Sequence, residues 1–153
     1  MQLSKNLSLA EMTRSESAKR LGISNMPTTE HLENMRKLAI NIFQPIREHF
    51  NVPVHISSGY RSAELNKKMK GASKTSQHCK GEAIDIDMDN TSVSNASIFN
   101  WIKDNLVFDQ LIWEFGNDNN PDWVHVSYSA TGKQRKQILK AIKKDGKTAY
   151  TSY

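Results

Sequence analysis

The chain has 153 residues, a single cysteine and a formal net charge of +5 at pH 7. This length predicts one domain over residues 1–153, large enough to bury a core without disulfides. No apolar run approaches the roughly 18 residues of a membrane span, and residues 1–5 lack the apolar stretch of a secretory signal. We therefore expect a monomer that is made in the cytoplasm, does not insert stably into membranes, and needs another factor to reach any external substrate.

The positive charge has two interpretations. It predicts either a solubilising surface, which we favour for Lys143 and Lys144, or attraction to a polyanion such as nucleic acid or envelope phosphates. The basic residues look dispersed, with no aromatic-interleaved stripe and no nucleic-acid motif. Nucleic acid is therefore not expected as a partner.

The sequence pattern of the N-terminal third predicts helices. Residues 8–21 predict one or two short helices that end at Gly22. Thr28 is a candidate cap for a long helix, in which apolar side chains recur at helical spacing over residues 32–50. Pro45 predicts a kink or a break in this helix.

The remaining elements alternate between strands and helices. Composition and periodicity predict strands over 54–58, 82–88, 110–115 and 123–128, helices over 63–70 and 95–106, and a polar loop over 71–77. The turn-rich segment 116–121 joins two of the strands into a hairpin, and 137–142 is ambiguous but favours a strand. The order indicates an α+β fold, with N-terminal helices packed on a small antiparallel sheet.

One group of residues has the composition of a metal site. His78, Asp85 and His125 offer two imidazoles and a carboxylate, which can hold one Zn²⁺ and leave a position open for water. Seven residues of strand would separate His78 from Asp85 by roughly 23 Å, so a turn at Gly81 must bring them together. His125 can then face Asp85 across adjacent strands.

Other metal-ligand side chains have weaker patterns. His31 and His49 lie on helix faces without partners, so we interpret both as structural. His55 lies on the predicted strand before the Gly59 turn and is a weaker candidate for lining the site. Cys79 is expected to be a buried, inert thiol.

Three motifs in order resemble one family. Ser-x-His-x-x-Gly-x-Ala-x-Asp over residues 76–85, Asp-x-x-His over 122–125 and Ser-Gly-Tyr-Arg over 58–61 are similar to the zinc D-alanyl-D-alanine peptidases, which share the hedgehog-type α+β fold. Residues 9–20 resemble the start of single-domain phage members. The likeness covers nearly the whole chain.

The resemblance implies roles for four residues. His78, Asp85 and His125 would be the zinc ligands, and Asp122, three residues before the last histidine, would be the general base. Asp122 can serve only if it lies in the turn before the strand, because alternation along a strand would send it and His125 to opposite faces. Glu114, at the end of the neighbouring strand, is the alternative base.

The same resemblance implies the substrate contacts. Arg61 matches an arginine that steadies the scissile carbonyl or a substrate carboxylate. Ser76 matches a serine near the substrate, and Tyr60 and Gln77 are candidates for lining the pocket. Asp87 is a candidate to orient a ligand histidine.

The implied substrate is the stem peptide of bacterial peptidoglycan. We expect an endolysin-type endopeptidase that acts on the cell wall after release, in the host periplasm. The alternatives are a D,D-carboxypeptidase that releases terminal D-alanine, and a non-catalytic zinc-binding domain of the hedgehog kind. A basic structural or nucleic-acid-binding protein is the third class, and no motif supports it.

Overall fold

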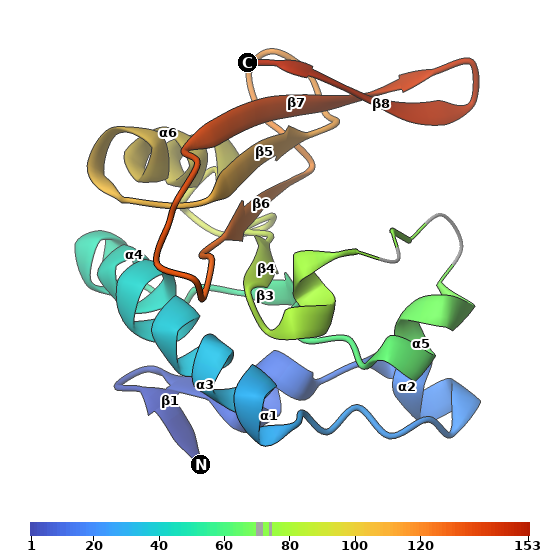
Figure 1. Ribbon diagram of the computed structural model, residues 1–153. Helices are drawn as coiled ribbons and strands as arrows, with labels where there is room; N and C mark the ends of the chain where they lie inside the picture. Colours follow the sequence, from blue (N-terminus) through green and yellow to red (C-terminus); the bar gives the residue numbers. More distant parts are fainter. Residues whose placement is uncertain (70–71, 74) are drawn as a thin grey trace.

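The computed structural model describes residues 1–69, 72–73 and 75–153 (Figure 1). The end of the predicted helix over 63–70 and parts of the predicted loop over 71–77 lie outside these residues. At the N-terminus, β1 (Gln2–Ser4) and β2 (Leu7–Ser8) form a small antiparallel sheet that the sequence patterns did not reveal. The region predicted to form one or two short helices contains two, α1 (Leu9–Thr13) and α2 (Glu16–Leu21).

The long helix is continuous but changes its winding. Thr28 caps α3 (Thr29–Leu38), and the chain then passes through a π-helical turn, η1 (Ala39–Phe43), into α4 (Gln44–Phe50). The Gln44 N–H donates to the Ala39 carbonyl five residues back. Pro45 lacks an N–H, and its ring would collide with the carbonyl four residues earlier in a regular helix. The wider turn absorbs this conflict, so the helix does not break at Pro45.

A six-stranded sheet forms the centre of the molecule. Its spatial order is β3 (Ile56–Ser58), β4 (Ala83–Ile86), β6 (Trp123–Ser127), β5 (Gln110–Glu114), β7 (Gln137–Lys144) and β8 (Lys147–Ser152). The neighbours are antiparallel except β5 and β7, which run parallel. The α+β class and the β5–β6 hairpin are confirmed, and the larger sheet is mixed. The ambiguous segment over 137–142 is a strand.

Alternation along the strands divides the sheet into two faces. One face supplies core residues, among them Ile84, Ile86, Leu111, Trp113, Val124 and Val126. They pack under the long helix and α6 (Asn95–Asn105), as Figure 1 shows. The opposite face is left for polar side chains, and it is partly covered by the short 3₁₀ helix η2 (Gln77–Lys80) that follows α5 (Ala63–Lys68). In the described part of the chain, no helix is long and apolar enough to cross a membrane.

Candidate metal centre

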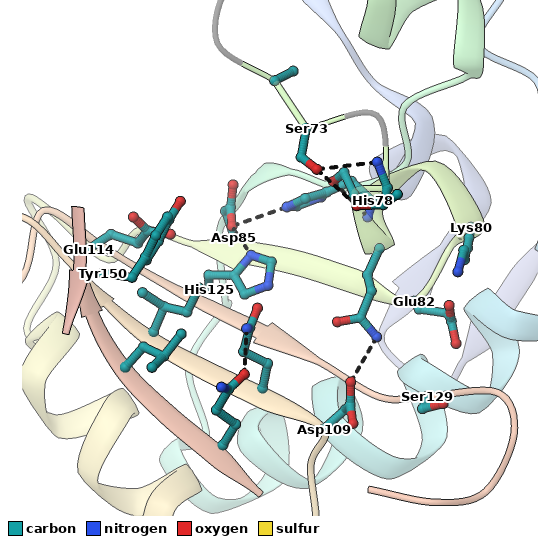
Figure 2. A pocket seen from close by; sticks show the side chains of 18 of the residues that line it. Ser73, His78, Lys80, Glu82, Asp85, Asp109, Glu114, His125, Ser129 and Tyr150 are labelled. Carbon is teal, nitrogen blue, oxygen red and sulfur yellow. Dashed lines mark hydrogen bonds and ion pairs between the residues drawn. The ribbon is translucent and has the colours of Figure 1, made fainter. Parts of the chain in front are cut away.

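Three elements bring the predicted ligands together on the polar face. His78 lies on η2, Asp85 on β4 and His125 on β6, and Asp85 pairs directly with His125 in the β4–β6 register. Asp85 Oδ1 is 3.3 Å from His78 Nε2 and 3.1 Å from His125 Nδ1 (Figure 2). The candidate ligand atoms of the three side chains all lie within 4.8 Å of one another.

The turn at Gly81 closes the distance between His78 and Asp85. Gly81 ends η2 in the left-handed conformation, with φ of 75°. A Cβ at this position would stand 2.5 Å from the His31 carbonyl oxygen. Both the backbone angle and the close approach require glycine, so the turn inferred from spacing has a clear physical basis.

The orientation of His78 is fixed from behind. Its Nδ1 is 2.7 Å from the Gly59 carbonyl oxygen. Because a carbonyl can only accept, Nδ1 carries the proton and Nε2 presents its lone pair to Asp85. Sequence reasoning missed this partner, since a backbone carbonyl leaves no residue-type signal. Asp87, the suggested partner, instead accepts from the Asp89 N–H at 2.9 Å.

The residues present fit a metal ion. With His78 neutral, its Nε2 and Asp85 Oδ1, 3.3 Å apart, are both acceptors, and a proton or a metal cation between them would relieve the conflict. His125 Nε2 is buried without a hydrogen-bond partner among the described residues. Burial alone would raise the pKa of Asp85, but the two imidazoles hold that pKa far below its usual range. Two imidazoles and one ionised carboxylate form a donor set typical of zinc.

A groove of about 940 Å³ surrounds this cluster. Its lining includes three of the predicted substrate contacts, Arg61, Ser76 and Gln77. Arg61 donates from Nη2 to Ser76 Oγ at 3.1 Å, and its buried Nε has no partner among the described residues. Gln77 donates to Asp109 at 3.1 Å. The arginine therefore reaches the groove with donor capacity left over.

Glu114 is the carboxylate that the fold brings to the ligand cluster. It ends β5, lines the groove and is 7% exposed. Burial raises its pKa to about 7; the positive charge of His125 opposes that shift and the negative charge of Asp85 adds to it. Figure 2 places Glu114 on the same side of the sheet as Asp85 and His125.

Asp122 lies elsewhere. It is exposed and does not line the groove, and its backbone N–H donates to the Glu114 carbonyl at 2.8 Å. The pKa of Asp89 is raised mainly by Asp87 and to a lesser extent by Asp122, which puts Asp122 near an acidic cluster. It does lie in the turn before β6, which begins at Trp123. Its exposure and its place outside the groove make Glu114 the better candidate for the base.

The remaining candidates have structural surroundings. Tyr60 is buried and its hydroxyl is 2.9 Å from His31 Nδ1, so neither side chain is directed to the groove. His49 stacks on Trp101 with ring centroids 4.4 Å apart. His55 lines a separate, smaller cavity of about 370 Å³.

Cys79, expected to be a buried thiol, is half-buried, and burial raises the pKa of its thiol above the ordinary value.

The chain was compared with models of known protein families. The profile of the Peptidase M15 family matches residues 5–127, which is most of the chain. The chain belongs to the peptidase M15 family. Its members are zinc-dependent peptidases, in agreement with the metallopeptidase class and the donor set described above. No curated protein matches the chain.

Proposed function

We propose that this M15 family member is a zinc peptidase that hydrolyses peptide bonds in the stem or cross-link of bacterial peptidoglycan. The observation that carries the proposal is a buried carboxyl group, Glu114, with a pKa of about 7 beside a three-residue donor set in an open groove. A carboxyl group with that pKa exchanges protons readily at neutral pH, as a general base must. His78, Asp85 and His125 would hold the ion.

Proton transfer falls to Glu114 in this proposal. A bound zinc ion supplies a Lewis acid that polarises a carbonyl and makes water easier to deprotonate. Glu114 accepts the proton of the attacking water as the new C–O bond forms, and then delivers it to the departing amine as the peptide C–N bond breaks. Its burial keeps the proton on a short path within the groove.

In this proposal, Arg61 contacts the carbonyl oxygen of the scissile peptide. Its guanidinium cannot lose its charge and donates from several N–H groups in one plane. Ser76 Oγ accepts from Arg61 Nη2 at 3.1 Å and from the His78 N–H at 3.2 Å. Ser76 thereby links Arg61 to η2, the helix that carries His78, and fixes the position of the guanidinium group. We propose that Arg61 stabilises the carbonyl oxygen as negative charge develops, with Ser76 and Gln77 at the substrate's edge.

The shape of the groove favours an endopeptidase. The groove extends from Ser73 and Arg61 past the ligand cluster to Tyr150 on β8, and towards Lys133 on another side. An endopeptidase must accommodate residues on both sides of the scissile bond. A D,D-carboxypeptidase is the second candidate, because Arg61 could instead hold the terminal carboxylate of the stem.

We also propose that the protein acts on the cell wall after release, as an endolysin would. Its positive charge is concentrated rather than dispersed: seven basic residues and one acidic residue lie in residues 128–153, a net charge of +6, whereas residues 1–127 carry −1. A cationic terminal segment is attracted to anionic envelope polymers. The neutral balance of the remainder gives no reason to expect nucleic acid.

Mass spectrometry of fragments released from purified peptidoglycan tests the function. The digest is run with native protein, with chelator, and with chelator followed by zinc. We expect zinc-dependent release of peptides. A new L-alanine carboxyl end identifies a stem endopeptidase, and free D-alanine identifies a carboxypeptidase. If zinc-loaded, folded protein released nothing from several wall types, the non-catalytic zinc-binding domain would be the better description.

A further inference from the structure

The C-terminal hairpin β7–β8 lies beyond the part of the chain that matches the family, yet it builds one wall of the groove. The match ends at residue 127, and β7 pairs with β5, the strand that carries Glu114 and lies next to β6. The hairpin contributes four groove-lining residues, Gln137, Leu139, Thr148 and Tyr150. These residues lie on one face of the hairpin because side chains alternate along each strand. The hairpin is therefore part of the groove's architecture.

The strand register places Tyr150 in line with Glu114. Glu114 pairs with Ala141 across β5 and β7, and Ala141 pairs with Tyr150 across β7 and β8. Two strand spacings amount to about 9.6 Å, which a tyrosine side chain leaning inward can largely span. Ala141 is fully buried and offers only a methyl group between them. The phenol can therefore lie over Ala141, and Figure 2 shows Tyr150 beside Glu114, whose charge acts on it.

The chemistry of the phenol suits a hydrogen-bond donor. Partial burial raises the pKa of Tyr150, and the negative charges of Glu114 and Asp85 raise it further. The hydroxyl therefore keeps its proton at physiological pH. Among the described residues its hydroxyl has no hydrogen-bond partner, and the residue is 56% exposed. A protonated, unengaged hydroxyl beside the reacting groups is available to a bound substrate.

We infer that Tyr150 is a catalytic residue whose hydroxyl donates a hydrogen bond to the substrate at the scissile peptide, from the side opposite Arg61. Arg61 follows β3 at one edge of the sheet, and Tyr150 lies on β8 at the other edge. The two donors therefore approach the ligand cluster from opposite sides. This inference rests on the proposed peptidase function and adds a residue outside the matched segment to its machinery.

Tyr150→Phe tests the inference because it removes only the hydroxyl. Tyr153→Phe is the matched control, since Tyr153 is similarly exposed but packs against Phe99 and Trp113 on the other face. Turnover is measured on a soluble stem peptide, and binding on a phosphinate peptide that imitates the tetrahedral state. Zinc content and thermal midpoint are measured on the same samples.

We expect Tyr150→Phe to lower kcat by about 10- to 100-fold, near the lower end of the loss for a donor to developing negative charge. The phosphinate should bind more weakly by a similar factor. KM, zinc content, thermal midpoint and the Tyr153→Phe control should stay unchanged. Turnover and phosphinate binding within twofold of the parent protein would overturn the role of Tyr150 alone. A parent protein that neither cleaves any stem peptide nor binds the phosphinate would overturn both this inference and the proposed function.

Discussion

At the scale of single residues, Glu114 carries a desolvation cost that its proposed role as general base explains. Its carboxyl group is buried at the end of a strand, with a pKa of about 7 against an ordinary 4.5. The folded state therefore binds this proton more tightly than the unfolded state does. The stability that depends on the proton is present below about pH 4.5 and is lost as pH rises to about 7.

Glu114→Gln should consequently stabilise the metal-free protein at high pH. We expect the free energy of unfolding of the variant, relative to the parent, to rise by about 3 kcal/mol between pH 4 and pH 8. The histidines titrate in both proteins, so the difference isolates the carboxyl group. Urea denaturation with chelator present measures it. A gap that stayed constant over this range would show that Glu114 is not held in the protonated form.

The metal ligands could be predicted from sequence because residue type and spacing encode them. His78, Asp85 and His125 needed only a glycine turn and an adjacent strand to meet. The sequence could not decide in the same way between Asp122 and Glu114 as the general base. Asp122 had the expected spacing, but the side to which its chain points depends on where β6 begins. The sequence signal for Glu114 was a lone carboxylate at the end of a largely apolar strand. By strand alternation, its side chain lies on the face of the sheet that carries the site.

At the scale of elements, the Gly81 turn links the fold to the site. Gly81→Ala would place a Cβ against the His31 carbonyl as well as forcing alanine into a left-handed conformation. Gly22→Ala is the matched control, because Gly22 has φ of 65° but nothing within 4 Å of the added Cβ. We expect a loss of about 1–2 kcal/mol for the control and a larger loss for Gly81→Ala.

Only Gly81→Ala should also weaken zinc binding, since it shifts His78 away from Asp85. Chemical denaturation and titration with zinc measure the two effects. Equal losses of stability in both variants, with unchanged zinc affinity, would mean that the turn does not position the ligand.

Elements governed by local pattern were predictable, and those governed by distant packing were not. The cap at Thr28 and the β5–β6 hairpin follow from neighbouring residues. The π-helical turn before Pro45 and the parallel pairing of β7 with β5 depend on how the whole chain packs. Periodicity carries no information about either feature.

At the scale of the whole molecule, residues 1–153 are proposed to act as one domain with an uneven charge. Its hairpin turn exposes three basic side chains, Lys143, Lys144 and Lys147. Replacing all three by glutamine should weaken binding to purified cell wall by at least tenfold, given about 1 kcal/mol per basic residue at an anionic surface. The effect should fade as salt is added.

Lys5, Lys19 and Lys67 are exposed lysines from the remainder of the chain, and their triple replacement by glutamine removes the same charge. Co-sedimentation with wall fragments over a range of salt concentrations measures binding. Cleavage of a soluble stem peptide should be the same in both triple variants. If both variants lost wall binding equally, net charge alone and not the hairpin would be responsible.

Peptide release from purified peptidoglycan by Glu114→Gln and Asp122→Asn, compared with the parent protein at equal zinc content, tests the central claim most directly. We expect Glu114→Gln to bind zinc and lose activity by about 100-fold or more, within the range of general-base catalysis. Asp122→Asn should remain within a fewfold of the parent. The opposite ranking, with Glu114→Gln active and Asp122→Asn inactive, would contradict the account.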